Sequence, residues 1–156
     1  MAAERGPEAK PATAAPSIRY ARLDDGDAVF GLLAQLGERY TPDRPVFDEA
    51  FAEAIKQTND HILYVAERDG SVVGYALATI ARLFYTNGDS AQLQELVVEE
   101  HARGAGIGSQ LVTAIEVECQ ARGVRQLTVA VISGAGIYER LDYRSTADFL
   151  KKIFDE

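Results

Sequence analysis

The stretch HARGAGIGSQLV, residues 101–112, places three glycines at alternate positions after an arginine and directly before an apolar, helix-like sequence. A strand, a glycine loop and a helix in this order direct unpaired backbone N–H groups and the positive end of the helix dipole to one place, which is typical of a phosphate site. Gly104, Gly106 and Gly108 allow positive φ angles and a close approach of the ligand, and Arg103 adds a cation. The spacing fits neither the G-x-G-x-x-G dinucleotide fingerprint nor the P-loop, so both are excluded. A purely structural turn is the alternative.

The segments around this loop predict a mixed α/β domain. Residues 1–16 are rich in Ala and Pro and lack aromatic or branched apolar side chains, so we expect a disordered tail before a single domain over residues 17–156. The order of elements lacks the regular alternation of a doubly wound sheet. The expected elements are strand 17–23, helix 24–36 ending at Gly37, helix 47–55, hairpin 61–84, strand 91–98, helix 107–122, strand 125–131, short helix 135–141 and a final strand within 144–154.

Two dipeptides suited to tight turns divide the central strands. Asp69-Gly70 separates two runs rich in β-branched and aromatic residues, which predicts the hairpin, and Asn87-Gly88 predicts a second turn before the next strand. The glycine loop follows that strand in the sequence.

Composition narrows the function classes. A formal charge of −8 without a block of Lys or Arg argues against a nucleic-acid partner and weakly favours amine partners, although solubility alone explains the same charge. The only cysteine, Cys119, lies one helical turn from Ile115 on an apolar stripe, so we expect a buried side chain rather than a nucleophile. His61 and His101 show no metal-ligand pattern, and no metal is expected. No apolar run reaches the ~20 residues that span a membrane, and the first residues lack the core of a signal peptide, so we expect a cytoplasmic protein.

The passage from Leu93 to Arg122 carries R-x-x-G-x-G, filled by Arg103, Gly106 and Gly108, and resembles the acetyl-CoA-binding segment of the GNAT superfamily of acyl-CoA N-acyltransferases. IRYARLDDGDAVFGLL resembles the first strand and helix of the family, YVAERDGSVVGYALA its second and third strands, and IYERLDY its Y-x-x-x-G-F motif. The resemblance covers roughly residues 17–145. It implies a GNAT-like α/β fold, in which a mixed central sheet splays apart between strands 4 and 5 and is flanked by helices.

The resemblance also implies an activity: an N-acetyltransferase that moves the acetyl group of acetyl-CoA to a primary amine by direct transfer in a ternary complex, without a metal. The glycine loop would hold the pyrophosphate of coenzyme A, and the strand before it would pair with the pantetheine arm at the splay. Tyr138 falls where the family places the tyrosine that protonates the departing thiolate. The residues implied for the cofactor are Leu96, Val97, Val98, Arg103, Gly104, Ala105, Gly106, Ile107, Gly108 and Ser109, with Ser133 as a further polar contact.

Glu95 is the candidate base, because strand alternation places it on the face opposite Leu96 and Val98, next to the expected thioester. Attraction of a cationic substrate is the alternative role for Glu95, and packing under the last strands is the alternative for Tyr138. The backbone N–H of Val97 or Val98 is the expected oxyanion donor.

Two positions depart from the family pattern. Val131 stands where an asparagine is common, and Asp142 stands where a glycine usually precedes the aromatic residue.

Acidic residues in and after the first two helices favour a small cationic acceptor, with aminoglycosides, polyamines, amino acids and protein amino termini left open. These residues are Glu38, Asp43, Asp48, Glu49 and Glu53.

The rival to the enzyme is a non-catalytic acyl-CoA-binding or protein-interaction domain of the same fold. The presence of both Tyr138 and Glu95 favours the enzyme. The apolar and aromatic content of TADFLKKIF, residues 146–154, predicts a strand-mediated homodimer.

Overall fold

The computed structural model describes residues 15–36, 40–131 and 136–154. In this part of the chain the strands form one sheet in the order β1-β2-β3-β4-β5, antiparallel from β1 to β4 and parallel between β4 and β5. The predicted mixed α/β class is therefore confirmed. The strands are β1 Ser17–Tyr20, β2 His61–Arg68, β3 Ser71–Leu83, β4 Gly88–Val98 and β5 Gln126–Val129.

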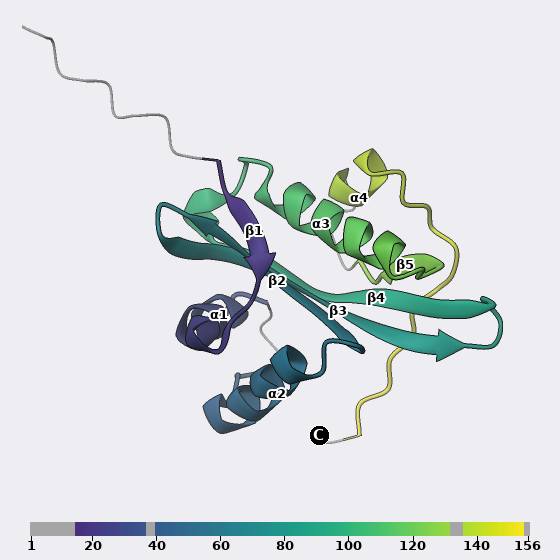
Figure 1. Cartoon of the computed structure of the whole chain (residues 1–156), viewed down its shortest axis with the longest axis horizontal. Helices are drawn as coiled ribbons and strands as arrows, with labels where there is room; N and C mark the ends of the chain where they lie inside the picture. The colour runs from purple at the N-terminus through teal and green to yellow at the C-terminus, as the bar shows by residue number, and fades with distance from the viewer. Residues whose placement is uncertain (1–14, 37–39, 132–135, 155–156) are drawn as a thin grey trace, which may run out of the picture.

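Helices cover both faces of the sheet, with α3 (Ile107–Ala121) on one face and α1 (Gly26–Leu33) and α2 (Arg44–Lys56) on the other (Figure 1). Short helical turns complete the description: η1 Leu23–Asp25, η2 Glu100–Ala102 and α4 Gly136–Arg140. None of the helices in the described ranges is long and apolar enough to cross a membrane.

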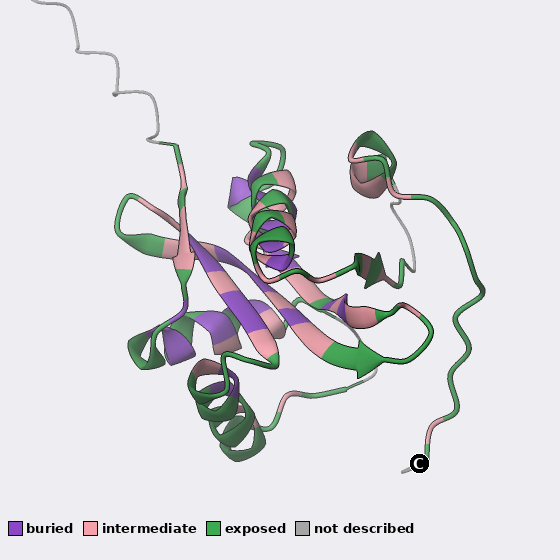
Figure 2. Cartoon of the chain, turned by 45° about the vertical axis from the view of Figure 1, so that its right-hand side comes forward, coloured by how far each residue is buried: buried purple, intermediate pink, exposed green. Residues whose placement is uncertain are grey.

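The sheet separates two apolar cores, whose buried residues line the central strands and the inner sides of the helices (Figure 2). On α3, Leu111, Ile115 and Cys119 recur at helical spacing and are buried against the sheet, as the sequence predicts for Cys119. On the other face, Val29 and Phe51 pack beside the buried Tyr75. Each fully buried Val, Leu, Ile or Phe side chain contributes about 1.5–3 kcal/mol to the free energy of folding.

The predicted hairpin turn between β2 and β3 is confirmed. Asp69 and Gly70 have φ angles of 53° and 79°, which match a turn that requires positive φ at both central residues. Asn87 also has a positive φ, 55°, at the turn into β4.

A β-bulge in β4 decides where the sheet opens. Leu77 pairs with Glu95 but Ala78 pairs with Leu93, so Gln94 is an extra residue in β4. The pairing of β4 with β5 runs only from Ser90 to Leu93, and the end of β4 has no β5 partner in the described residues. The splay implied by the family resemblance is thus present, and it begins at the bulge.

Several expected elements differ from the structure. The first strand ends at Tyr20 rather than at residue 23, and the second helix begins at Arg44 rather than at residue 47, because a proline is tolerated in the first turn of a helix. The first helix ends at Leu33 rather than at residue 36, and the predicted stop, Gly37, lies outside the described residues, as does most of the predicted tail, residues 1–14. The expected last strand is wrong for a single chain, because residues 144–154 pair with none of the described strands. The physical reason lies in the pattern: Phe149 and Leu150 are adjacent apolar residues, which would face opposite sides of a strand, and no second layer covers them here.

An ion pair fixes β1 to the entrance of α1. Arg19 donates from Nη1 and Nη2 to the carboxylate of Asp25 at 2.8 and 2.9 Å, and from Nε to Glu67 of β2 at 2.7 Å. The backbone N–H of Arg22 donates to the same carboxylate at 2.7 Å. Asp25 is only 6% exposed, and the hydrogen bonds from Arg19 hold its pKa below its ordinary value.

We predict that Asp25→Asn lowers the free energy of unfolding at neutral pH by about 2–4 kcal/mol, because it leaves Arg19 without its main partner. Asp24→Asn is the matched control: Asp24 has a side chain 76% exposed and an ion pair with Arg22 at 3.3 Å, so its loss should cost less than about 1 kcal/mol. Urea denaturation measures both.

The pH dependence follows from the direction of the pKa shift of Asp25. Because the folded pKa lies below the unfolded one, the contribution is complete above about pH 4 and disappears as the pH falls through the folded pKa. The gap in stability between the wild-type chain and Asp25→Asn should therefore narrow in acid. Equal losses in the two variants at neutral pH would contradict the anchoring role of Asp25.

Candidate functional site

An open groove of about 690 Å³ lies at the splayed end of the sheet. Its walls come from the end of β4, the glycine loop with the first turn of α3, the helix α4 and the residues after α1. The lining residues are Gln35, Leu36, Leu96, Val97, Val98, Arg103, Gly104, Gly106, Ile107, Gly108, Ser109, Ile137 and Arg140. The structure thus brings together nearly all residues predicted for the cofactor, although Ala105 is not among the lining residues and Ser133 lies outside the described residues.

The end of β4 directs backbone hydrogen-bonding groups toward this groove. The N–H of Glu99 donates to the carbonyl of Val73 in β3 at 2.7 Å. In an antiparallel pair the residues bonded to the partner alternate, so Val97 faces β3, whereas Leu96 and Val98 direct their N–H and C=O groups away from it. The N–H of Val97 is therefore bonded within the sheet and is not available as an oxyanion donor, whereas the N–H of Val98 is available.

The N-terminus of α3 opens into the same groove. Gly106 is the N-cap residue, with φ of 80°, and the first helical bond runs from the N–H of Gln110 to its carbonyl at 3.1 Å. The N–H groups of Ile107, Gly108 and Ser109 therefore have no partner within the helix. No described side chain caps them, and the first turn contains no acidic residue. These donors and the helix dipole together favour an anion.

The glycines of the loop have two different roles. Gly104 and Gly106 have φ angles of 85° and 80°, as the sequence predicts. Gly108 lies within the helix without a positive φ, but a Cβ atom there would lie 3.2 Å from Cδ1 of Ile137 and 3.8 Å from Cγ2 of Val98. Gly108 therefore keeps space open between α3, α4 and β4.

Arg103 connects three parts of the groove wall. Its Nε donates to the carbonyl of Val98 at 3.0 Å, and its Nη2 donates to Oε1 of Gln35 at 3.1 Å. The amide of Gln35 in turn donates to Glu99 at 3.4 Å. Arg103 thus ties the loop to the end of β4 and to the residue that follows α1, in addition to supplying a positive charge.

Sequence reasoning missed four residues of the groove wall, Gln35, Leu36, Ile137 and Arg140, and one of its neighbours. Gln35 and Leu36 lie far from the glycine loop in the chain, and no local pattern connects them to it. Arg140 adds a second cation to the lining, and its position two residues after Tyr138 was the available signal. Tyr75 of β3 lies among apolar residues in the sequence, but its hydroxyl forms a hydrogen bond with Glu95.

Glu95 is held by that buried tyrosine. The hydroxyl of Tyr75 donates to Oε1 of Glu95 at 2.7 Å, and the residue Tyr75 is 2% exposed. Burial raises the pKa of Tyr75 well above its ordinary value, so the phenol stays protonated and keeps donating. Glu95 lies next to the groove in β4 but is not one of its lining residues. Its role as a base stays a prediction.

Tyr138 lies on α4, half-buried, with its ring edge-on to that of Tyr143 at 5.6 Å between centroids. Burial raises the pKa of Tyr138, so the phenol is protonated at neutral pH, as a proton donor must be. Its neighbours Ile137 and Arg140 line the groove, whereas Tyr138 packs against the core under α3. Its role as an acid also stays a prediction.

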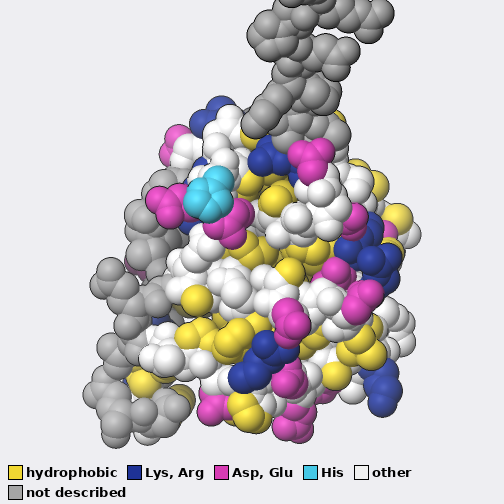
Figure 3. All heavy atoms as spheres, turned by 90° about the vertical axis from the view of Figure 1, so that its left-hand side faces the viewer, with side chains coloured by type: hydrophobic (Ala, Val, Ile, Leu, Met, Phe, Trp, Pro, Cys, Tyr) yellow, Lys and Arg dark blue, Asp and Glu magenta, His cyan; other side chains and the backbone are white. Residues whose placement is uncertain are grey.

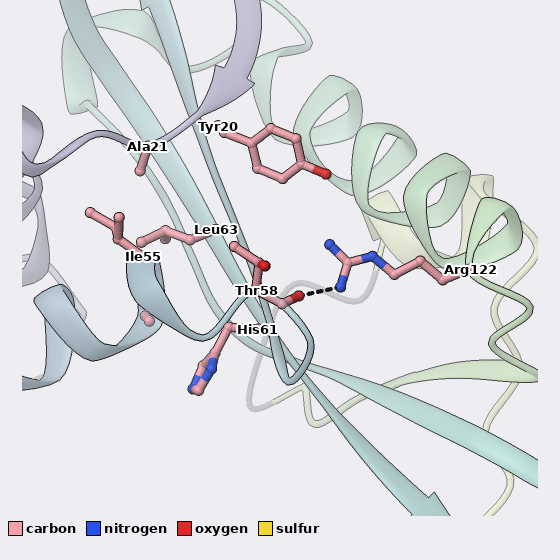
Figure 4. A pocket seen from close by; sticks show the side chains of 8 residues that line it. Tyr20, Ala21, Ile55, Thr58, His61, Leu63 and Arg122 are labelled. Atoms are coloured by element: carbon pink, nitrogen blue, oxygen red, sulfur yellow. Dashed lines mark hydrogen bonds between the residues drawn. The ribbon is translucent and has the colours of Figure 1, made fainter.

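A second cavity of about 320 Å³ lies at the opposite end of α3, between Tyr20, Ile55, Leu63 and Arg122 (Figure 4). Nε of Arg122 donates to Glu118 at 2.8 Å, and Nη1 donates to the carbonyl of Thr58. The charge of Arg122 is therefore already balanced, and Figure 4 shows the ring of His61 pointing away from it. The groove at the glycine loop is the better site for an anion.

Two of the acidic residues that suggested a cationic acceptor, Asp43 and Asp48, have local structural roles. Asp43 accepts a hydrogen bond from the N–H of Val46 at 3.1 Å and caps the helix. Asp48 pairs with Arg44 at 2.8 Å. The space-filling view likewise shows acidic side chains beside Lys or Arg over one face (Figure 3). Glu38 lies outside the described residues.

Comparison with known proteins finds acetyltransferases both among family models and among curated relatives. The model of the acetyltransferase (GNAT) domain matches residues 59–145. The aminoalkylphosphonate N-acetyltransferase of Salmonella typhimurium is 35% identical over 107 residues, which cover 68% of this chain and 68% of that protein.

Solved structures match over most of the chain. The crystal structure of glucosamine-6-phosphate N-acetyltransferase from Arabidopsis thaliana gives a TM-score of 0.80 at 22% identity, covering 91% of this chain and all of that one. The crystal structure of a predicted acetyltransferase with acetyl-CoA from Clostridium acetobutylicum gives 0.75 at 18% identity, covering 88% of this chain and 96% of that one. At these identities the two structures show that the fold is shared.

Proposed function

The chain belongs to the GNAT family of acetyltransferases, and on that basis we propose that it transfers the acetyl group of acetyl-CoA directly to a small primary amine, in a ternary complex. One observation carries the proposal: the uncapped N-terminus of α3 and the open edge of β4 face the same groove. A long ligand with a phosphate at one end and amides along its length is complementary to both features.

The residues of the groove fit acetyl-CoA by their chemistry. The N–H groups of Ile107, Gly108 and Ser109 would hold the pyrophosphate, with Arg103 and Arg140 as nearby cations. The N–H and C=O groups of Leu96, and the C=O of Val98 beside its bond from Arg103, would pair with the pantetheine amides. When bound, acetyl-CoA supplies an activated thioester, and the chain supplies alignment around it.

Three groups of the chain would then act on charge and protons. The N–H of Val98 would stabilise negative charge on the thioester oxygen. Tyr138 would give its proton to the departing thiolate, and Glu95 would accept a proton from the amine, directly or through water. The bond from Tyr75 occupies Oε1 of Glu95 and leaves Oε2 for that proton.

For the acceptor we propose a small-molecule amine rather than a protein. Two relatives are named for amines that carry a phosphonate or a phosphate, namely an aminoalkylphosphonate and glucosamine 6-phosphate. The local pairing of Asp43 and Asp48 weakens the argument for a polycationic acceptor. Phosphoryl-bearing amines therefore come first in a screen, ahead of polyamines and amino acids.

Release of free thiol from acetyl-CoA tests the activity. We expect saturable, protein-dependent release with at least one primary amine of the screen and almost none without an amine. Tight binding of acetyl-CoA without release for any amine class would favour the non-catalytic binding domain of the same fold instead.

The glycine loop can be tested with a matched pair of variants. Gly106 and Gly70 have φ angles of 80° and 79°, and a Cβ atom at either position would meet nothing within 4 Å. Alanine should therefore strain both sites alike, by about 1–2 kcal/mol.

Only Gly106→Ala should weaken binding of coenzyme A, by about tenfold or more, because relief of its strain redirects the donors at the start of α3. Calorimetric titration of each variant gives the affinities, and urea denaturation checks the matched strain. Equal affinity in the two variants would mean that the loop is only a turn.

Tyr138→Phe retains the aromatic ring and removes the proton. We predict a fall in kcat of about 100-fold, with unchanged binding of acetyl-CoA. Tyr143→Phe is the control, because it removes the neighbouring hydroxyl, which donates to Glu116 at 2.8 Å, and should leave kcat within about threefold. Full turnover by Tyr138→Phe would exclude the acid role and favour packing alone.

Glu95→Gln removes the carboxylate, so that the amine must arrive already deprotonated. We predict that the rate of this variant falls more steeply than that of the wild-type chain as the pH decreases, because the fraction of unprotonated amine falls. Steady-state rates from pH 6 to pH 9 give the two profiles. Superimposable profiles would remove Glu95 from the proton transfer.

A further inference from the structure

Tyr75 of β3 places a hydroxyl group inside an apolar core, on the face of the sheet that α1 and α2 cover (Figure 1). The residue is 2% exposed, and its buried neighbours are apolar side chains of α1, α2, β2 and β4. Phenylalanine would fill the same volume without a polar group, and burying a hydroxyl costs free energy unless it is hydrogen-bonded. Among the described residues, the carboxylate of Glu95 is the hydrogen-bond partner of this hydroxyl, at 2.7 Å.

The partner of Glu95 differs in charge from that of another carboxylate of the described chain. Glu118 of α3 is paired with Arg122 at 2.8 Å, and this guanidinium holds the pKa of Glu118 below its ordinary value. Such a carboxylate is a poorer proton acceptor. Tyr75 is neutral, so it fixes the carboxylate of Glu95 without placing a full positive charge beside it.

The main chain of Tyr75 lies beside the expected oxyanion donor. Tyr75 is the register partner of Val97, and this pairing directs the N–H of the next residue, Val98, away from β3. The side chain of Tyr75 thus contacts the candidate base, while its backbone pairs with the neighbour of the candidate oxyanion donor. One residue of β3 therefore fixes both groups relative to each other.

The carboxylate of Glu95 needs such a contact because of where it lies. Glu95 follows the bulge at Gln94, and its side chain is only partly buried. A glutamate side chain has several rotatable bonds and samples many rotamers when nothing holds it. The bond to Oε1 selects one orientation and leaves Oε2 in a defined place, which lowers the cost of alignment in a reaction.

We propose that Tyr75 is a positioning residue for the acetyl transfer: its hydroxyl holds Oε1 of Glu95, so that Oε2 stays directed at the incoming amine. This inference rests on the proposed function. The amine nitrogen forms its bond to the acetyl carbon and gives a proton to Oε2, while the C–S bond breaks and the thiolate takes the proton of Tyr138. Tyr75 itself neither gains nor loses a proton, because burial keeps its phenol protonated.

A double-mutant cycle tests the role of Tyr75. We expect Tyr75→Phe to lower kcat about tenfold and to leave the KM for acetyl-CoA within about twofold, because the ring and the groove are retained. In the Glu95→Gln background the same change should have no further effect on kcat. Losses that multiply in the double variant would overturn the proposal, since a general disturbance of the core would slow the reaction with or without the carboxylate.

Tyr64→Phe is the matched control. Tyr64 lies in β2, and its hydroxyl donates to Glu118 at 3.4 Å on the other face of the sheet. This variant also loses a bond from a tyrosine to a glutamate, and it should keep kcat within about twofold of the wild-type chain. An equal loss of kcat in Tyr64→Phe and Tyr75→Phe would contradict a specific role for Tyr75.

Carbon-13 NMR of the full chain with labelled glutamate tests the contact without substrate. The carboxyl signal of Glu95, assigned by its loss in Glu95→Gln, should move in Tyr75→Phe and stay in place in Tyr64→Phe. An unmoved signal in Tyr75→Phe would overturn the proposal. Full turnover by Tyr75→Phe would reject the positioning role alone, whereas a wild-type chain that acetylates no amine of the screen would reject the proposed function and this role with it.

Discussion

The bulge at Gln94 is the constraint on which the site depends. β4 is parallel to β5 before the bulge and parts from it afterwards. The extra residue also keeps Leu96 and Val98 on the face that Ala91 and Leu93 occupy, against α3. Without it, Glu95 would point into that apolar core. One inserted residue thus opens the sheet edge and turns a carboxylate toward Tyr75 on the other face.

The open edge leaves backbone groups that need partners. Buried N–H and C=O groups are nearly always paired, so a strand edge and a helix N-terminus that share one groove form an incomplete hydrogen-bonding surface. A pantetheine-like chain would complete the edge of β4, and a pyrophosphate would complete the first turn of α3. The specificity for this ligand would therefore come mainly from backbone geometry, with Arg103 and Gly108 setting charge and space.

Local patterns explain which features could be predicted from the sequence. The hairpin at Asp69-Gly70, the α3 stripe and the positive φ angles of Gly104 and Gly106 follow from short-range rules, and the structure confirms them. The bulge is visible in the spacing of the apolar residues of β4 that face α3. The spacing is two residues from Ala91 to Leu93 and three residues from Leu93 to Leu96. Gln35 could not be predicted, because its contact with Arg103 spans 68 positions in the chain and depends on tertiary packing. Residues 144–154 were predicted as a strand from their composition, but they pair with none of the described strands, and a strand forms only beside a neighbouring strand.

The most direct test of the account is a calorimetric titration of the folded wild-type chain with acetyl-CoA and with coenzyme A, using ATP as the control. The account predicts saturable binding of acetyl-CoA and coenzyme A at one site per chain and no comparable binding of ATP, because the groove combines an anion site with an open strand edge that only the pantetheine arm can use. The absence of binding by both acetyl-CoA and coenzyme A, or equal binding of ATP, would contradict it.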